Sequence, residues 1–416
     1  MNFSRIEEAV AAMKEGRPVV VADHPGRENE GDLIVAAEKI TPELVAFIVR
    51  HTSGIICVSL LPDRLEQLRL PLMVPDNAEA HRTAFTVSVD WKHGTTTGVS
   101  AADRSATIRA LADPGVVAEG FVRPGHIFPL RCEPAGVLAR PGHTEAAVDL
   151  ARLAGLFPAG VLCEIVNDDG SMAQGEQRED FARRHHLPYI TIPELVAYRR
   201  SRERLVTKTA TARLPTRHGV FTTHVYRSIL DGAEHVALVK GEVNGRENVL
   251  VRVHSECVTG DVLGSLRCDC GQQLENALAR VAREETGVVL YLRNHEGRGI
   301  GLTDKLRAYA LQDEGLDTVQ ANVKLGLPVD ARSYDVGAQI LTDLGLTTIR
   351  LMSNNPAKFQ GLETYRLKIV ERVPLLTTPT CENHSYLRAK QVKLGHLLDL
   401  SVAGLDFPKE ELVGRS

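Results

Sequence analysis

Three closely spaced cysteines constrain this chain more than any other feature of its sequence. Cys257 is followed, after ten residues, by Cys268-Asp269-Cys270. In the preceding segment 249–253, valine alternates with other residues, which is the period-two pattern of a half-buried strand. In the following segment 274–281, apolar residues recur at helical spacing, so a helix is predicted to begin near the last two thiols. The cysteines are therefore expected between the end of a strand and the start of a helix.

Thiolates are soft ligands that suit zinc, and three protein ligands leave one tetrahedral position for water or substrate. The Cys-x-Cys spacing is tighter than that of zinc fingers, which favours a catalytic zinc site. Two other interpretations remain open at this point. The thiols could be buried or redox-active without a metal, or His254 could add a fourth ligand and close a structural site.

The chain as a whole has the composition of a soluble protein with two or three domains. It has 416 residues, of which 43% are hydrophobic and 25% charged, and its net charge is -4. This charge predicts no nucleic-acid or membrane partner. Seven cysteines and the absence of an apolar signal segment favour a reducing cytoplasm. A charged stretch at 198–208, followed by Pro215, predicts a boundary between domains 1–200 and 201–416.

An acidic run lies between two predicted strands in the first half. Arg27-Glu28-Asn29-Glu30-Gly31-Asp32 brings three carboxylates together between apolar segments 19–22 and 33–37. Carboxylates this close repel one another unless a cation lies among them, and oxygen ligands suit magnesium. The alternative interpretation is a solvated charged turn.

Two Pro-Gly-His turns follow, one containing His126 and the other His143. Thr144 is expected to cap the next helix, which would place His143 at its positive end. Further on, Glu164 lies in a predicted buried strand at 161–166, where a carboxylate requires a partner. Histidines in matching turns, with Arg140 beside one of them, are candidates for catalysis or metal binding.

The first half resembles 3,4-dihydroxy-2-butanone 4-phosphate synthase over roughly residues 5–200. The resemblance rests on the acidic run, on Phe85-Thr86-Val87-Ser88-Val89-Asp90, on Gly125-His126, on Gly142-His143-Thr144-Glu145 and on Glu164. It implies conversion of ribulose 5-phosphate to dihydroxybutanone phosphate and formate, with Mg2+ or Mn2+ held by Glu28 and His143. It also implies catalytic roles for His126 and Glu164. The residues that would hold the sugar phosphate are Arg27, Glu28, Asp32, Arg140, Pro141, Gly142, His143, Thr144 and Glu164.

Two segments depart from the pattern of that family. The chain has Asp23-His24-Pro25-Gly26 where the family has an acidic run, and Arg131-Cys132-Glu133-Pro134-Ala135 where a basic, glycine-rich segment is usual. An alternative is therefore a GTP cyclohydrolase II that carries an inactive first domain.

The second half resembles GTP cyclohydrolase II over roughly residues 205–400. The resemblance rests on Arg252-Val253-His254-Ser255-Glu256-Cys257, the Cys-x-Cys pair, Glu296-Gly297-Arg298 and Asn354-Asn355-Pro356. It implies hydrolysis of GTP to a diaminopyrimidine ribosyl phosphate, formate and pyrophosphate. Zinc would be bound by Cys257, Cys268 and Cys270, and Mg2+ by the GTP phosphates. The implied GTP contacts are Arg252, Val253, His254, Ser255, Glu256, Gln273, Glu296, Gly297, Arg298, Thr318, Ser353 and Lys358.

The segment from Val329 to Tyr334 resembles the remaining catalytic part of this family. The resemblance implies that Asp330 accepts a proton and that Arg332 is a nucleophile towards the α-phosphate. Because arginine is almost always protonated, a charge-stabilising clamp is the plainer role for Arg332.

The order of the two halves is that of bifunctional riboflavin biosynthesis proteins, which implies a homodimer that acts on ribulose 5-phosphate and GTP. Strands and helices alternate around the cysteines, so the fold class is α/β, with α+β character in the first half. Each domain is expected to be a mixed sheet with packed helices. A different class, a non-enzymatic protein stabilised by zinc, is the remaining alternative.

Overall fold

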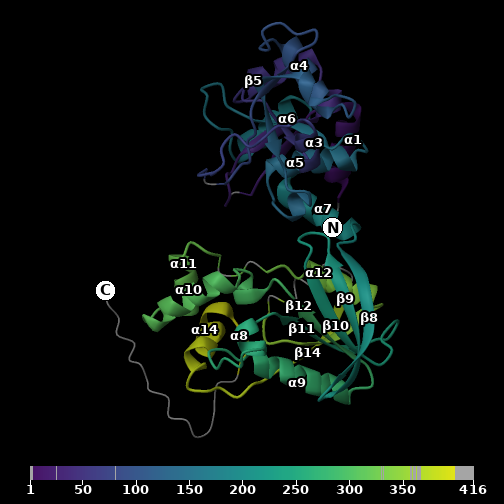
Figure 1. Ribbon diagram of the computed structural model, residues 1–416, viewed down its shortest axis with the longest axis vertical. Coiled ribbons are helices and arrows are strands. Elements are labelled where there is room, and N and C mark those ends of the chain that lie inside the picture. Colours follow the sequence, from purple (N-terminus) through teal and green to yellow (C-terminus); the bar gives the residue numbers. More distant parts are fainter. Residues whose placement is uncertain are drawn as a thin grey trace. The chain divides into compact units, whose positions relative to one another are not determined.

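The computed structural model describes residues 3–24, 26–79, 81–328, 330, 332–356, 358, 362 and 367–398. The chain divides into two compact units, Met1–Glu203 and Arg204–Ser416 (Figure 1). Of the segments named above, Pro25, Val329, Ala331 and the tail from residue 403 lie outside the described residues.

The first unit contains a seven-stranded mixed sheet in the order β4-β5-β3-β6-β2-β1-β7. Its strands are β1 (Val19–Ala22), β2 (Gly31–Ala36), β3 (Cys57–Leu60), β4 (Val89–Trp91), β5 (Phe121–Arg131), β6 (Ala159–Glu164) and β7 (Tyr189–Thr191). The antiparallel pairing of β2 with β6 sets Asp32 opposite Glu164. Two acidic residues far apart in the sequence thereby come together at one end of the sheet.

Helices cover the first sheet, and apolar clusters fill the space between them. The helices are α1 (Ser4–Glu15), α2 (Pro42–His51), α3 (Pro62–Gln67), α4 (Ala101–Ala112), α5 (His143–Leu153), α6 (Glu176–Arg184) and α7 (Ile192–Arg202), with short 3-10 turns η1 (Ala37–Lys39), η2 (Ala118–Gly120) and η3 (Gly136–Leu138). Helix α5 is central, because it packs on α1, α7 and four of the strands. Its first residue is His143, and its N-cap is Gly142. The prediction that Thr144 caps this helix is wrong, since Thr144 is its second residue.

The second unit also contains a seven-stranded mixed sheet, in the order β14-β13-β11-β12-β10-β9-β8. Its strands are β8 (Val206–Thr216), β9 (Gly219–Ser228), β10 (Glu234–Lys240), β11 (Val249–Ser255), β12 (Gly287–Leu292), β13 (Thr348–Met352) and β14 (Lys368–Val373). Strands β12, β11, β13 and β14 run parallel to one another, so the ends of β11, β12 and β13 meet at one edge of the sheet.

The helices of the second unit include α8 (Val258–Asp261), α9 (Cys270–Arg283), α10 (Leu302–Asp313), α11 (Thr318–Lys324), α12 (Asp335–Asp343) and α14 (His384–Leu394), with the 3-10 turn η4 (Glu296–Arg298). The predicted strand before the cysteines is β11, and the predicted helix after them begins at Cys270. The expected fold class, two α/β domains with mixed sheets, is confirmed.

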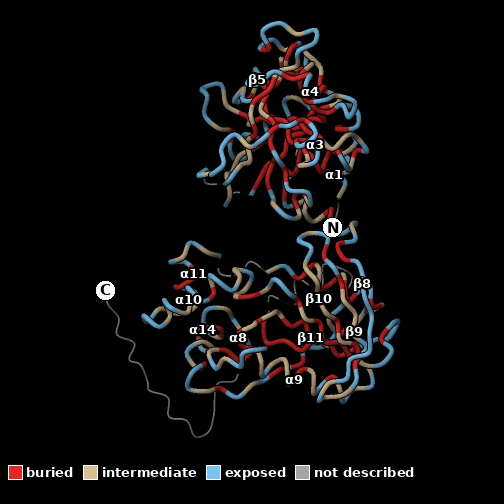
Figure 2. The backbone as a smooth tube through the Cα atoms, viewed as in Figure 1, coloured by how far each residue is buried: buried red, intermediate tan, exposed pale blue. Residues whose placement is uncertain are grey.

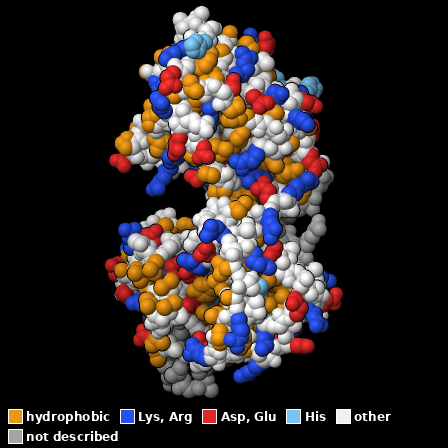
Figure 3. Space-filling view, turned by 45° about the vertical axis from the view of Figure 1, so that its right-hand side comes forward, with side chains coloured by type: hydrophobic (Ala, Val, Ile, Leu, Met, Phe, Trp, Pro, Cys, Tyr) orange, Lys and Arg blue, Asp and Glu red, His pale blue; other side chains and the backbone are white. Residues whose placement is uncertain are grey.

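Burial follows the central strands of each sheet, as the red segments of Figure 2 show. Strand β8, at one edge of the second sheet, is mostly exposed. On the face shown in Figure 3, basic and acidic side chains are interspersed over both units, in keeping with the small net charge of -4. None of the described helices has the length and apolar character needed to cross a membrane.

Candidate active sites

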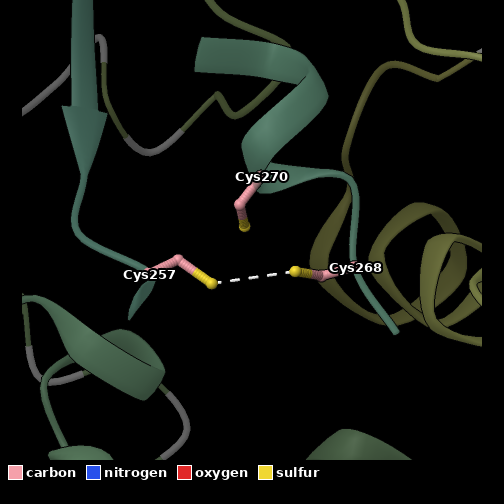
Figure 4. A group of neighbouring side chains, drawn as sticks. All are labelled: Cys257, Cys268 and Cys270. Carbon is pink, nitrogen blue, oxygen red and sulfur yellow. Dashed lines mark hydrogen bonds between the residues drawn. The ribbon is translucent and has the colours of Figure 1, made fainter. Parts of the chain in front are cut away.

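The three cysteines of the second unit converge on one point (Figure 4). Cys257 follows β11, Cys268 lies in the loop before α9, and Cys270 is the first residue of α9. The sulfur atoms of Cys257 and Cys268 are 3.7 Å apart, and all three sulfur atoms lie within 4.8 Å of one another. Hydrogen bonds from the Cys268 and Cys270 thiols lower the pKa of Cys257. Three sulfur ligands at this spacing fit a single thiophilic ion such as zinc.

A glycine provides the space for this cluster. A Cβ atom at Gly260 would lie 2.9 Å from the sulfur of Cys268 and 3.2 Å from that of Cys257. Helix α8 therefore approaches the thiols with bare backbone, and a side chain at this position would displace the sulfur atoms.

His254 does not belong to the cysteine cluster. Its Nε2 atom lies 3.0 Å from Oδ1 of Asp261, and its ring stacks on Tyr291 at 5.5 Å between centroids. Asp261 also accepts a bond of 3.0 Å from the backbone N–H of Cys257. His254 thus supports the loop that carries Cys257, and the described ligand set contains three cysteines, which is the open arrangement of a catalytic site.

A buried ion pair between Lys305 and Glu296 lies against the cysteine cluster. Lys305 contacts a carboxylate oxygen of Glu296, and its Nζ atom is 3.1 Å from the sulfur of Cys257 and 2.7 Å from Oγ1 of Thr259. The second oxygen of Glu296 accepts the N–H of Val258 at 2.6 Å. Both oxygens of Glu296 are thus engaged within the protein, away from the cavity wall.

A cavity adjoins the cysteines at the ends of β11 and β13. Most of the predicted GTP contacts line it, together with the three cysteines, and they come from six separate parts of the chain. These residues are Arg252, His254, Ser255, Glu256, Gln273, Gly297, Arg298, Thr318, Arg332, Ser353 and Lys358. Val253, Glu296 and Asp330 are not on the wall. The backbone oxygen of Val253 instead accepts a bond of 2.9 Å from Lys358.

The described wall of this cavity carries six lysines and arginines but only one carboxylate, that of Glu256. Among these cations, Arg252, Arg298 and Lys358 have no carboxylate partner within the described parts of the chain. Both terminal nitrogens of Arg298 are buried and have no described hydrogen-bond partner. Burial, together with the positive charges of Arg252 and Arg332, lowers the pKa of Lys358 well below its ordinary value. A polyanion would supply the missing counter-charge.

Arg332, on the wall of the cavity, forms a bidentate ion pair with Asp330. Nε and Nη2 of Arg332 donate to the two oxygens of Asp330 at 2.8 and 2.5 Å. Burial acts to lower the pKa of Arg332, but the bond to Asp330 outweighs it and raises the pKa above its ordinary value. The guanidinium is therefore held in its charged form.

Several wall residues were not found from the sequence. They are His295, Ile300, Lys305, Ala308, Tyr309, Gln312, Asn322, Asn354, Asn355, Tyr386, Lys390 and His396. Asn354 and Asn355 belong to a motif that carried the resemblance, but the others showed no spacing or composition that marks a site. The last three come from the segment after β14, which reaches the cavity only through the tertiary fold.

The first unit has its own cavity, and seven of its predicted site positions line it beside Glu30 and Cys57. These seven are Arg27, Glu28, Asp32, Arg140, His143, Thr144 and Glu164. Pro141, Gly142 and His126 are not on this wall. The structure thus joins the acidic run, the second Pro-Gly-His turn and the end of β6 in one place.

The imidazole of His143 is oriented for a metal. Its Nε2 atom lies 3.1 Å from the backbone oxygen of Val21, which leaves Nδ1 facing Glu28 at 3.8 Å and Asp32 at 3.6 Å. A carbonyl partner on one nitrogen is the usual support of a metal-ligating histidine. Burial acts to lower the pKa of His143, but the negative charge of Asp32 and the bond to Glu28 raise it to about 9. Oδ1 of Asp32 is buried without a described hydrogen-bond partner.

Asp23 lies with Glu28 and His143 in a group that could hold a cation. Its oxygens accept the backbone N–H groups of Glu28 and Glu30, each at 3.0 Å, and Nη1 of Arg27 at 3.2 Å. Asp23 therefore shapes the turn that presents Glu28. The oxygen and nitrogen ligands of this group fit Mg2+ or Mn2+ better than a thiophilic ion.

Two arginines flank a space at the start of α5. A Cβ atom on Gly142 would lie 2.9 Å from Oε2 of Glu145, which pairs with Arg140, 3.3 Å from Nη2 of Arg27 and 3.6 Å from Nη1 of Arg140. The first turn of α5 adds backbone N–H groups and the positive end of the helix dipole at the same point. This arrangement suits a phosphate group.

The second segment that departs from the family pattern is tied into the fold. The N–H of Glu133 donates to Glu145 at 3.1 Å, and the backbone oxygen of Ala135 accepts a bond of 2.8 Å from Arg199. The segment therefore braces α5 and α7. His24 accepts a bond of 3.0 Å from the N–H of Gly26 within the first departing segment.

The two sites together define a two-domain enzyme. The first cavity joins carboxylates, a histidine and two arginines, and the second joins three cysteines to a wall rich in lysine and arginine. The first unit matches the family model of 3,4-dihydroxy-2-butanone 4-phosphate synthase over residues 7–198, and the second matches that of GTP cyclohydrolase II over residues 207–374. The chain belongs to the family of bifunctional riboflavin biosynthesis proteins, in which these two domains are fused in this order.

Similar proteins occur in bacteria and plants. The chain is 60% identical over 398 residues to the riboflavin biosynthesis protein RibBA of Salinispora arenicola, covering 96% of this chain and 95% of that protein. It is 57% identical over 405 residues to a chloroplastic bifunctional riboflavin biosynthesis protein of Arabidopsis thaliana, covering 97% and 75%. Among solved structures, RibBX, a two-domain 3,4-dihydroxy-2-butanone 4-phosphate synthase from A. baumannii, superimposes with a TM-score of 0.68 at 36% identity, covering 89% of this chain and 99% of that one.

Proposed function

We propose that this chain makes both precursors of riboflavin. Its first unit converts ribulose 5-phosphate to 3,4-dihydroxy-2-butanone 4-phosphate and formate. Its second unit hydrolyses GTP to 2,5-diamino-6-(5-phosphoribosylamino)pyrimidin-4(3H)-one, formate and pyrophosphate. The observation that carries the second activity is the three-cysteine cluster beside three buried or half-buried cations that have no described carboxylate partner.

In the second unit, Cys257, Cys268 and Cys270 would hold Zn2+. When bound, zinc supplies Lewis-acid activation of the water that opens the imidazole ring of GTP. Arg252, Arg298 and Lys358 offer charge to the triphosphate, to which Mg2+ also binds in this proposal.

Arg332 acts as a charge-stabilising clamp on the α-phosphate, because its ion pair with Asp330 holds it protonated and a protonated guanidinium has no free lone pair for attack. Asp330 is the proposed proton acceptor, and it becomes free to act when the phosphate displaces it from Arg332. Trapping a guanylyl adduct on Arg332 would contradict the clamp.

In the first unit, Glu28 and His143 would hold Mg2+ or Mn2+, which supplies a Lewis acid for the vicinal oxygens of the sugar. The phosphate lies between Arg27 and Arg140, over Gly142 and Thr144. Asp32 and Glu164 face the sugar from adjacent strands, and Glu164 transfers protons. Its Oε2 atom accepts a bond of 2.5 Å from Ser53, which holds the carboxylate in place.

The position of His126 supports the proposal of a homodimer. Its side chain is 46% exposed, and its Nδ1 atom lies 2.7 Å from Oδ2 of Asp90. His126 is not on the wall of the cavity that holds Glu28 and His143. We propose that a second copy of the chain brings His126 to that cavity. From the sequence, we also propose that the protein is cytoplasmic.

The homodimer is tested by combining two inactive variants of the chain. The variants His126→Ala and Glu164→Gln are each expected to lose formate release from ribulose 5-phosphate. If His126 serves the cavity of its partner, refolding the two variants together restores part of the activity, because some dimers then contain one intact site. A mixture as inactive as its components would place both residues in the site of one copy.

The function itself is tested by formate release from the purified chain, with ribulose 5-phosphate and Mg2+ in one reaction and GTP and Zn2+ in another. Formate is expected from both substrates. The variants Cys268→Ser and His143→Asn should each abolish one reaction and leave the other. Formate from GTP alone would support the alternative in which the first unit has lost activity.

A further inference from the structure

The segment after β14 forms one wall of the cavity beside the three cysteines, where the proposed GTP contacts lie. It follows the region matched by the GTP cyclohydrolase II family model, which ends at residue 374. Its helix α14 contributes Tyr386 and Lys390 to the wall, and the turn after the helix contributes His396. None of these three residues was expected at the site from the sequence.

Three anchors hold this segment against the cavity. Lys390 forms an ion pair of 3.0 Å with Asp269, which lies between two of the cysteines. Lys393 pairs with Asp317, the N-cap residue of α11. The backbone N–H of Leu397 donates to the oxygen of Asn354 at 2.9 Å. Each anchor thus reaches a different segment that carries a proposed ligand or GTP contact.

The first anchor continues into the cavity as a chain of bonds. Asp269 accepts Nζ of Lys390 on one oxygen, and on the other it accepts Nε2 of Gln273 at 2.5 Å and the hydroxyl of Thr377 at 3.1 Å. The amide oxygen of Gln273 then accepts Nη2 of Arg252 at 2.6 Å. Lys390, Asp269, Gln273 and Arg252 therefore form one connected path.

This path of hydrogen bonds fixes the orientations of Gln273 and Arg252. Gln273 can rotate its amide by half a turn, and the carboxylate of Asp269 selects the orientation in which its oxygen faces Arg252. Asp269 is 2% exposed, so without a cation its charge would be buried uncompensated.

We infer that Lys390 is a positioning residue of the GTP site, which acts through Asp269 and Gln273 to fix Arg252 towards the triphosphate. This role rests on the proposed GTP hydrolysis. The alternative is that the ion pair of Lys390 with Asp269 only holds α14 in place. The two differ in what they affect, since a structural pair would change stability, whereas a positioning residue would change the binding of GTP.

The test compares Lys390→Met with Arg388→Met in the full chain loaded with zinc. Arg388 is a matched control because it is a basic residue on the exposed side of the same helix. For each protein, KM and kcat for GTP, the dissociation constant for GTP, zinc per chain and formate release from ribulose 5-phosphate are measured. K390M is expected to raise KM and the dissociation constant about tenfold or more. Zinc content and the reaction of the first unit should stay at the level of R388M.

Two further variants distinguish a positioning role of Lys390 from a purely structural role. K390R keeps the charge and should recover most of the affinity, and K390M combined with Gln273→Ala should bind GTP hardly more weakly than Gln273→Ala alone. If K390M folds poorly, K390Q, which keeps a hydrogen-bond donor without the charge, is measured in its place.

The inference is overturned if K390M binds GTP as well as R388M does, or if the effects of K390M and Gln273→Ala multiply independently. It is equally overturned if affinity falls only in proportion to lost zinc. A wild-type chain that neither binds nor opens GTP would instead refute the proposed function, and the inference with it.

Discussion

The ammonium group of Lys305 lies 3.1 Å from the sulfur of Cys257 and also contacts the buried carboxylate of Glu296. One side chain of α10 thus joins a proposed zinc ligand to the turn after β12. Lys305 and Glu296 have side chains that are 9% and 8% exposed, so each depends on the other for counter-charge.

This relationship predicts a strong coupling between the two residues. Lys305→Met leaves Glu296 buried without a cation and should destabilise the second unit by about 3–5 kcal/mol. The double variant K305M with Glu296→Gln removes both charges and should recover a large part of that loss. Chemical denaturation at saturating zinc measures the cycle. Additive losses in the double variant would show that the pair does not act as a unit.

A second prediction concerns the phosphate of ribulose 5-phosphate. The backbone at Gly142 has a φ of -125°, which alanine adopts without strain, so Gly142→Ala acts by filling the space between Arg27 and Arg140 and by pressing on the Glu145 carboxylate that pairs with Arg140. KM for ribulose 5-phosphate should rise roughly tenfold, the order of effect expected when a charged hydrogen bond is lost. GTP turnover of the same preparation is the internal control. An unchanged KM would place the phosphate elsewhere.

A third prediction follows from His143. Its pKa of about 9 means that the ring is protonated at pH 7.5, and Nδ1 must lose this proton to bind a metal. Mg2+ binding at pH 7.5 should therefore release about one proton, and the affinity should increase with pH up to about 9. Calorimetry in buffers of different ionisation enthalpy measures the release. The variant His143→Asn should release no proton from this position, and a wild type that behaves like it would remove His143 from the ligand set.

A fourth prediction concerns the acid stability of the second unit. Burial and the nearby charges of Arg332 and Lys358 lower the pKa of His295 to about 3, against about 6.5 in an unfolded chain. Between these values the unfolded state binds the proton, so the contribution of His295 is complete above pH 6.5 and is lost as the pH falls. At pH 5.5 the loss is about 1.4 kcal/mol.

The variant His295→Gln lacks this titration. Between pH 7.5 and 5.5 it should lose about 1.4 kcal/mol less stability than the wild type, as measured by denaturant unfolding at each pH. Equal losses in the two proteins would mean that His295 titrates normally in the folded state.

The elements around the cysteines could be read from the sequence because their signals are local. The alternation of valines marked β11, and the helical spacing after Cys270 marked α9. The N-cap of α5 was misplaced by two residues, at Thr144 instead of Gly142, since both residue types occur as caps and only the backbone conformation distinguishes them. The proposed GTP contacts came from motifs, and the structure gathers most of them on one cavity wall.

The sequence by itself determined the chemistry of the ligands and the local elements, because thiols, carboxylates and hydrophobic periodicity act over a few residues. Only the tertiary structure decided which of these groups meet. It turned Glu296 inwards to Lys305, separated His126 from the cavity of Glu28, and brought Lys390 from α14 to Asp269. The physical reason is that a buried charge must find its counter-charge in space, and the order of strands in the sheet, rather than spacing along the chain, determines which partner is within reach.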